Sequence, residues 1–264
     1  MSATRIALAL GAALSLLTFP ALAVNQLRTH SGQEVGLSFS HYQYKEPDLM
    51  KLEGNKFGID YTTTLMLDQN QEWFMKIAGR YAFGDVNYDS VSTGSTKGED
   101  DWYTEIRALF GKDLDFGSQV LAPFSGLGFR YLDNDGAGIT TTTGHYGYGR
   151  TSNYVYLPIG AIHRISLNAN SLLETTLEAD FLLYGKQKSY LSGATIENKQ
   201  KEGYGFRLSS FYRQGPWAIG PYYDYWKISK SETDTAMDTS GTQWIFWEPK
   251  NNTNEYGIKA SYRF

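Results

Sequence analysis

The chain has 264 residues, a formal net charge of −4, no cysteine, and an aromatic content of 15% made up of 20 Tyr, 14 Phe and 6 Trp. The mild acidity and the lack of a Lys/Arg stripe exclude nucleic acid as a partner. The absence of cysteine excludes a disulfide framework, so stability must come from a large core or from a lipid bilayer.

Residues 1–23 have the layout of a secretory signal peptide. Arg5 supplies a positive charge, an apolar stretch follows from Ile6 to Pro20, and Ala21-Leu22-Ala23 is a small-x-small cleavage pattern. The apolar stretch is short for a membrane anchor, which needs about 20 residues. We therefore expect export and cleavage after Ala23, with residues 24–264 forming one barrel domain.

About ten segments after the leader alternate between apolar and polar residues. In the clearest of them, Trp73, Met75 and Ile77 share one face, and Lys76 and Arg80 share the other. Successive strand residues point to opposite faces, so this pattern predicts β-strands. The segments are Glu34–Tyr44, Lys56–Leu65, Glu72–Gly84, Trp102–Phe110, Val120–Leu132, Asn153–Ile165, Leu172–Tyr184, Gly203–Arg213, Trp217–Ile228 and Tyr256–Phe264.

The connections between these segments alternate in length. Short ones fall near Met66–Gln71, Gly111–Gln119, Ser166–Ser171 and Gln214–Pro216. Long ones fall near Lys45–Asn55, Asp85–Asp101, Asp133–Ser152, Lys186–Glu202 and Ser229–Thr253. Transmembrane barrels have short turns on one side, long loops on the other, and an even number of strands. The spacing predicts an all-β, antiparallel, up-and-down transmembrane β-barrel of about ten strands, with eight and twelve as alternatives.

The polar face of the predicted strands carries many charges of both signs. A sheet crosses lipid only if it closes on itself, so this face would line the lumen. Burying such groups costs several kcal/mol each unless they are paired, and we expect a lumenal network centred on Arg107 and Glu178. The expected members are Lys76, Arg80, Glu105, Arg107, Arg130, Glu174, Glu178, Asp180, Arg207, Asp224, Glu255, Lys259 and Arg263.

The last strand carries the most specific pattern, with Tyr256, Ile258, Tyr262 and the final Phe264 on one face. In this pattern the chain resembles the bacterial outer-membrane β-barrel proteins, in particular the small porin-like and adhesin-like group. The resemblance implies a location in the outer membrane of a Gram-negative bacterium, among lipid and lipopolysaccharide. It also implies that the four residues form the signal that the barrel-assembly machinery reads.

Candidate catalytic and metal sites are weak. The omptin proteases are also ten-stranded, and an Asp pair with His145 can in principle activate water, but the Asp-x-His spacing of that family is missing. Asp133-Asn134-Asp135-Gly136 resembles the start of a calcium loop without its bidentate Glu. We therefore assign no catalytic residue, no metal and no cofactor.

The segment around His145, Tyr146, Tyr148 and Arg150 interleaves Gly with Tyr and Arg, which is typical of an adaptable recognition surface. Ten strands lie near the size at which side chains fill a barrel, well below the 16–18 strands of open porins. We expect a non-enzymatic surface protein that meets an unidentified extracellular ligand. A narrow channel for small solutes is the alternative, and an omptin-like surface protease is a minor one.

Overall fold

A computed structural model describes residues 27–191, 194–237 and 242–264. The predicted leader and its cleavage site after Ala23 lie outside these residues. In the part described, no helix is long and apolar enough to cross a membrane. The barrel strands are β1 (Gly32–Glu46), β2 (Met50–Met66), β3 (Trp73–Ser90), β4 (Gly94–Lys112), β6 (Gln119–Asp135), β7 (Gly149–Asn168), β8 (Ser171–Leu191), β10 (Gly203–Gln214), β11 (Trp217–Ile228) and β14 (Asn251–Arg263).

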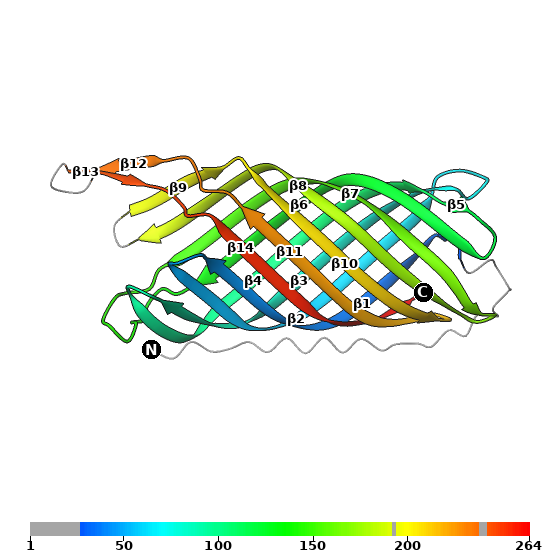
Figure 1. Cartoon of the computed structure of the whole chain (residues 1–264), viewed down its shortest axis with the longest axis horizontal. Coiled ribbons are helices and arrows are strands. Elements are labelled where there is room, and N and C mark those ends of the chain that lie inside the picture. Colours follow the sequence, from blue (N-terminus) through cyan, green and yellow to red (C-terminus); the bar gives the residue numbers. More distant parts are fainter. Residues whose placement is uncertain (1–26, 192–193, 238–241) are drawn as a thin grey trace.

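These strands form a closed barrel (Figure 1). Each pairs antiparallel with the next, and β14 returns to pair with β1, for example through Val35 and Tyr262. β8 has two partners on the same side. Its last part pairs with the short β9 (Ala194–Gln200), and the rest of it pairs with β10. The predicted ten-stranded, up-and-down antiparallel barrel is confirmed, and the alternatives of eight and twelve strands are wrong.

The outer surface of the barrel is apolar. Large side chains such as Leu37 (66% exposed) and Ile258 (61% exposed) point away from the lumen. Aromatic pairs flank this band. Trp73 stacks on Phe110 with ring centroids 5.0 Å apart towards one end, and Trp102 lies 5.3 Å from Tyr131 towards the other. Such aromatic girdles are typical of barrels that meet the two surfaces of a bilayer.

The two ends of the barrel differ. At the end called here the terminal end, the C-terminus lies beside short turns and β5 (Leu114–Asp115) (Figure 1). At the hairpin end, strand pairs extend well past the apolar band. A separate two-stranded sheet, β12 (Asp234–Met237) with β13 (Gln243–Phe246), projects from this end (Figure 1).

Three of the long loops expected from the sequence, Lys45–Asn55, Asp85–Asp101 and Lys186–Glu202, are mostly strand. Glu46 pairs with Met50, so only three residues turn between β1 and β2, where we expected a loop over Lys45–Asn55. β7 and β8 have 20 and 21 residues, although about 9–11 suffice to cross a bilayer. Beyond the apolar band neither face of a strand meets lipid, so the apolar–polar alternation stops while the hydrogen-bonded ladder continues.

Candidate functional site

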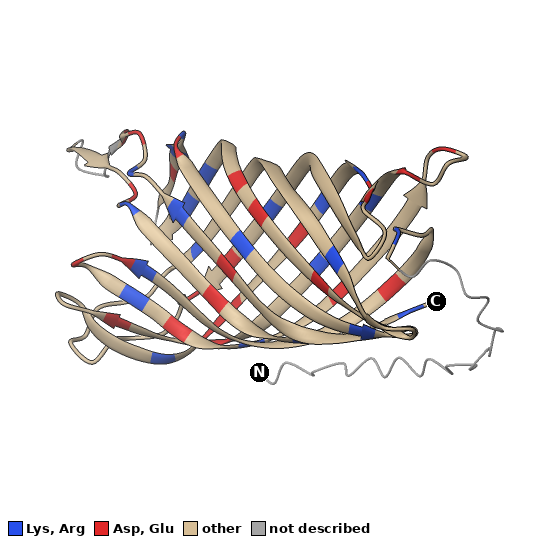
Figure 2. Cartoon of the chain, turned by 45° about the vertical axis from the view of Figure 1, so that its right-hand side comes forward, with Lys and Arg blue, Asp and Glu red and all other residues tan. Residues whose placement is uncertain are grey.

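The candidate site is the lumen, whose wall carries charged residues of both signs along its length (Figure 2). Its centre is the carboxylate of Glu255 on β14, which is 1% exposed. Arg80 donates to Glu255 over 2.7 Å, and the hydroxyls of Tyr103 and Tyr222 donate over 2.8 and 2.9 Å. Ser40 adds a fourth donor at 2.9 Å. One carboxylate thus joins five strands, and we call this group the Glu255 hub.

A second group crosses the lumen beside the hub. Arg207 on β10 makes a bidentate pair with Glu105 on β4, at 2.6 and 2.9 Å, although three strands separate β4 from β10. The hydroxyl of Tyr156 donates to Glu105 over 2.7 Å. Arg207 also donates to Asp180 over 2.7 Å and lies 3.6 Å from Asp224. Bidentate Arg–carboxylate pairs are among the strongest polar contacts, so this group fixes the two walls against each other.

The remaining predicted lumenal residues lie around these two groups. Arg107 pairs with Glu178, and Arg130 stacks 4.1 Å above the ring of Tyr103. Lys259 donates to Asp60 over 3.1 Å, and Arg263 donates to the carbonyl of His30. Glu174 accepts from two arginines that we did not include in the network, Arg164 at 2.6 Å and Arg213 at 2.9 Å. Lys76 lies 5.8 Å from the ring of Phe74.

Five tyrosines of the described chain are buried in the lumen, and none of them was included in the predicted network. They are Tyr42, Tyr103, Tyr154, Tyr156 and Tyr222. Each follows the strand phase of an inward charge, as Tyr103 does with Glu105 and Tyr222 with Asp224. This shared phase could have placed the tyrosines in the lumen. We did not use it because aromatic residues in a barrel are expected at the lipid boundary.

The terminal end of the lumen is covered by the chain before β1. Thr29 donates to Asp113 through its amide and hydroxyl, at 2.5 and 2.9 Å. Leu27 is buried against Val120 and Leu172. Arg164 donates to the carbonyl of Leu27 over 3.3 Å, which ties this covering segment to the wall.

The hairpin end is crossed by a smaller group. Arg150 on β7 donates to Glu46 on the opposite strand β1 over 3.2 Å, and Tyr44 bridges Glu46 and Glu248 at 3.0 and 3.2 Å. Glu248 follows β13, outside the apolar band, and its burial and the nearby Glu46 raise its pKa above the usual carboxyl range. Arg150 thus lies on β7 and reaches across the lumen mouth, whereas we expected it on an exposed recognition loop.

The other three candidates for loop recognition lie nearer the surface. Tyr146 is 84% exposed and Tyr148 is 38% exposed, on the connection that precedes β7. His145 contacts the hydroxyl of Thr143 at 2.9 Å, which in turn donates to the carbonyl of Thr93 on the neighbouring hairpin. These contacts hold the two hairpins together beyond the barrel.

The candidate catalytic and metal residues have structural contacts. His41 lies 3.4 Å from Glu53, and His163 contacts Gln119 at 2.9 Å. Asp135 accepts from the amide of Ala137 at 3.0 Å, which is a turn contact. Within the described ranges, no group of three or more His, Asp and Glu residues is arranged to hold a metal ion.

Two cavities between the side chains of the described residues bear on the function of the lumen. One of about 240 Å³ runs from Arg28 and Arg263 at the terminal end to Tyr222 at the centre. Another of about 40 Å³ lies below the hairpin end and is lined by Tyr42 and Arg150. Glu255, Tyr103 and Arg130 line neither cavity and are at most 2% exposed, so they fill the cross-section between the two.

The predicted assembly-signal residues lie on the outer face of β14. Tyr256, Ile258 and Phe264 are 54%, 61% and 65% exposed. Tyr262 packs edge-on against Trp217 of β11, with ring centroids 4.8 Å apart. The last strand therefore offers a continuous apolar stripe next to the seam where β14 meets β1.

No family model and no curated protein matches the chain in sequence. Among solved structures it is similar to the outer-membrane protease OmpT of Escherichia coli, with 11% identity over 88% of this chain and 97% of that chain and a TM-score of 0.60. It is also similar to the transport unit of the Escherichia coli autotransporter AIDA-I, with 9% identity over 88% and 90% and a TM-score of 0.51. Likeness at these identities concerns the fold. The chain therefore has the closed antiparallel barrel fold of bacterial outer-membrane proteins.

Proposed function

We propose that the protein resides in the outer membrane with its hairpin end outside the cell, and acts there as a surface recognition protein with a closed lumen. The observation that carries the proposal is the pair of side-chain groups that cross the lumen. The Glu255 hub joins five strands, and the Glu105–Arg207 pair links opposite walls. A diffusion pore needs an open water path, and removing these buried charges from their partners would cost several kcal/mol each.

Planar-bilayer recording of the refolded protein tests the closed lumen. We expect no single-channel steps from the wild type. The double variant Tyr103→Ala and Tyr156→Ala removes two rings that are 1% and 0% exposed, and should produce discrete conductance steps. The matched control, Tyr61→Ala with Tyr204→Ala, removes two lipid-facing rings and should stay silent. Steps from the wild type would instead favour the narrow-channel alternative.

The outer hairpins supply the recognition surface. Tyr146 and Trp247 are 84% and 49% exposed, and the Lys230 ammonium lies 4.4 Å above the Trp247 ring. Aromatic rings beside a cation suit phosphorylated sugars, which stack on the rings and pair with the charge. We therefore propose lipopolysaccharide as the first ligand to test.

Binding of purified lipopolysaccharide to the refolded protein tests this ligand. Tyr146→Ser together with Trp247→Ser should lower the affinity about tenfold, which corresponds to about 1.4 kcal/mol. Retained affinity, or no binding by the wild type, would contradict lipopolysaccharide as the ligand.

The exposed stripe on β14 fits the proposed role of Tyr256, Ile258, Tyr262 and Phe264 as the signal for the barrel-assembly machinery. We do not extend the activity of OmpT to this chain. At 11% identity the likeness concerns the fold, and the candidate His145 contacts Thr143.

A further inference from the structure

We propose that the larger lumenal cavity is a binding site for a small organic anion with an apolar body, such as a medium-chain carboxylate. The site lies between the Glu255 hub and the covering segment Leu27–Thr29, and it is separate from the outer recognition surface. Two features of the cavity support this inference: its unsatisfied donors and its apolar wall.

Most of the cations that line the cavity are already paired. Nine basic and six acidic residues line it, and four further carboxylates, Asp113, Asp115, Asp180 and Glu255, pair with lining arginines from behind. The attraction for an anion therefore comes from those lining cations whose donors lack acceptors.

Two of the lining cations have donors to spare. Lys76 makes no hydrogen bond or ion pair in the part of the chain that the structure describes, and its ammonium lies 5.8 Å from the ring of Phe74. Arg107 uses one terminal nitrogen for Glu178, but its buried Nε has no hydrogen-bond acceptor in the part of the chain described. A buried donor without a partner costs about 1–3 kcal/mol.

The two cations that carry these donors lie close together on the inner wall of the barrel. Lys76 faces Leu109 across the β3–β4 ladder, and Ala78 faces Arg107. Lys76 and Arg107 are thus diagonal neighbours on the inner face, with Cβ atoms roughly 7–8 Å apart or less. One carboxylate placed between them would accept from both.

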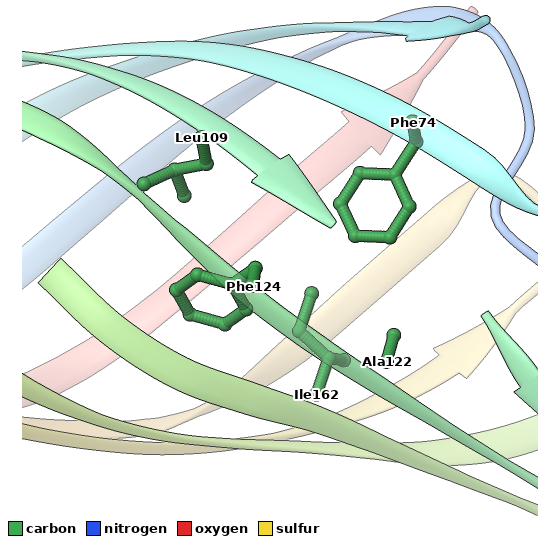
Figure 3. Packing of buried hydrophobic residues seen from close by; sticks show 5 residues of the cluster. All are labelled: Phe74, Leu109, Ala122, Phe124 and Ile162. Carbon is green, nitrogen blue, oxygen red and sulfur yellow. The ribbon is translucent and has the colours of Figure 1, made fainter. Parts of the chain in front are cut away.

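The same cavity has an apolar wall. Leu109, Phe124 and Ile162 line it and belong to a buried cluster with Phe74 and Ala122, whose side chains converge inside the barrel (Figure 3). Such a surface offers water no hydrogen bonds. Burying the hydrocarbon part of a ligand against it contributes about 25 cal/mol of binding free energy per Å². Leu109 lies opposite Lys76 in the ladder, so the apolar wall begins beside the two cations that have unused donors.

The volume and the position fit a small ligand. An apolar cavity of about 150 Å³ holds benzene, and this one measures about 240 Å³. Arg28, Gln33 and Arg263 line its end nearest the terminal turns, beside the covering segment. A six-carbon carboxylate would fit without displacing the Glu255 hub.

Isothermal titration of the refolded full-length barrel in an uncharged detergent tests the site, with hexanoate as the probe. We expect saturable binding of hexanoate, weaker binding of acetate, which lacks the apolar body, and no binding of hexanamide, which lacks the charge. Lys76→Met should weaken hexanoate binding about 10- to 100-fold, as expected for the loss of one charged hydrogen bond. The control Lys250→Met removes the same charge from an exposed position and should bind like the wild type.

Three results would overturn the proposal: no saturable binding of hexanoate, equal binding of hexanamide, or unchanged affinity in Lys76→Met. If Lys76→Met does not refold, the comparison of the three probes on the wild type still decides between a binding site and a water-filled cavity.

Discussion

At the scale of single residues, the lumen is held by a few carboxylates that each serve several donors. Glu255 accepts from Arg80, Tyr103, Tyr222 and Ser40. Glu255 is 1% exposed, so its main contribution is to give the buried guanidinium of Arg80 a charged partner. Exposed pairs at the hairpin end, such as Lys51 with Glu53, stay hydrated and contribute little.

Glu255→Ala should therefore destabilise the barrel by about 3–5 kcal/mol, the usual cost of breaking a buried ion pair on one side. The control Glu53→Ala, at a side chain 36% exposed, should change stability by less than about 1 kcal/mol. Urea unfolding in lipid vesicles measures both. Equal effects of the two substitutions would show that the Glu255 hub does not hold the barrel together.

Glu248 gives the hairpin end a dependence on pH. Its folded pKa is raised, first by burial and then by Glu46, so the protonated form suits the folded arrangement. A raised carboxyl pKa means that the folded state binds the proton more tightly, and stability falls as the pH rises from the usual carboxyl range through the raised value. The contact between Ser231 and Glu248 that closes the base of the β12–β13 hairpin should loosen over this range.

Hydrogen exchange of the segment around Ser231 and Glu248 checks this, with exchange times corrected for the intrinsic effect of pH on amides. Protection should be greater at pH 5 than at pH 8 in the wild type, and independent of pH in Glu248→Gln. The idea is wrong if the variant keeps the dependence of the wild type.

The inward charges could be predicted from the sequence because they alternate with lipid-facing residues. Their partners could not. Glu105 and Arg207 are 102 positions apart, and they meet only because closure of the barrel places β4 and β10 on facing walls of the lumen. The inward tyrosines were missed although they share the phase of the charges. Arg150 was expected on a loop because β7 continues beyond the apolar band, where apolar and polar residues no longer alternate.

At the scale of strands, glycines mark where neighbouring backbones approach closely. A Cβ at Gly126 of β6 would lie 2.0 Å from the carbonyl oxygen of Ala108 on β4, whereas a Cβ at Gly79 of β3 would meet nothing within 4 Å. A side chain therefore has no room at Gly126, whereas Gly79 has open space beside it. Designed and natural barrels use glycine in this way to bend a sheet.

Gly126→Ala should destabilise the barrel by more than about 1 kcal/mol because the β4–β6 ladder must shift, while Gly79→Ala should be nearly neutral. Thermal unfolding of the two variants measures the difference. Similar melting temperatures would mean that the close approach at Gly126 is relieved at no cost.

Strand number and order could be predicted because each crossing of the lipid repeats the same alternation. Strand length could not. The pairing of Glu46 with Met50 and the long β7 and β8 lie outside the apolar band, where Gly, Ser, Thr and Tyr resemble loop residues in composition. What holds these extensions is backbone pairing, which leaves no periodic mark on the sequence.

At the scale of the whole molecule, lipid imposes the fold and leaves the function open. A sheet must close to satisfy its backbone in hydrocarbon, so the pattern of one face is enough to predict a barrel. The ligands proposed here would meet the outer hairpins and a lumenal cavity, and neither is subject to that constraint. The lumen contains two groups of side chains that cross it and a cavity whose wall is partly charged and partly apolar.

Cysteine labelling on whole cells tests the central claim most directly, because the chain has no cysteine of its own. Tyr146→Cys lies at the hairpin end and Phe116→Cys at the terminal end, where the native side chains are 84% and 62% exposed. A membrane-impermeant maleimide should label Tyr146→Cys on intact Gram-negative cells, and Phe116→Cys only after the outer membrane has been permeabilised. Labelling of Phe116→Cys on intact cells, or of Tyr146→Cys only after permeabilisation, would contradict a barrel that spans this membrane with its hairpins outside.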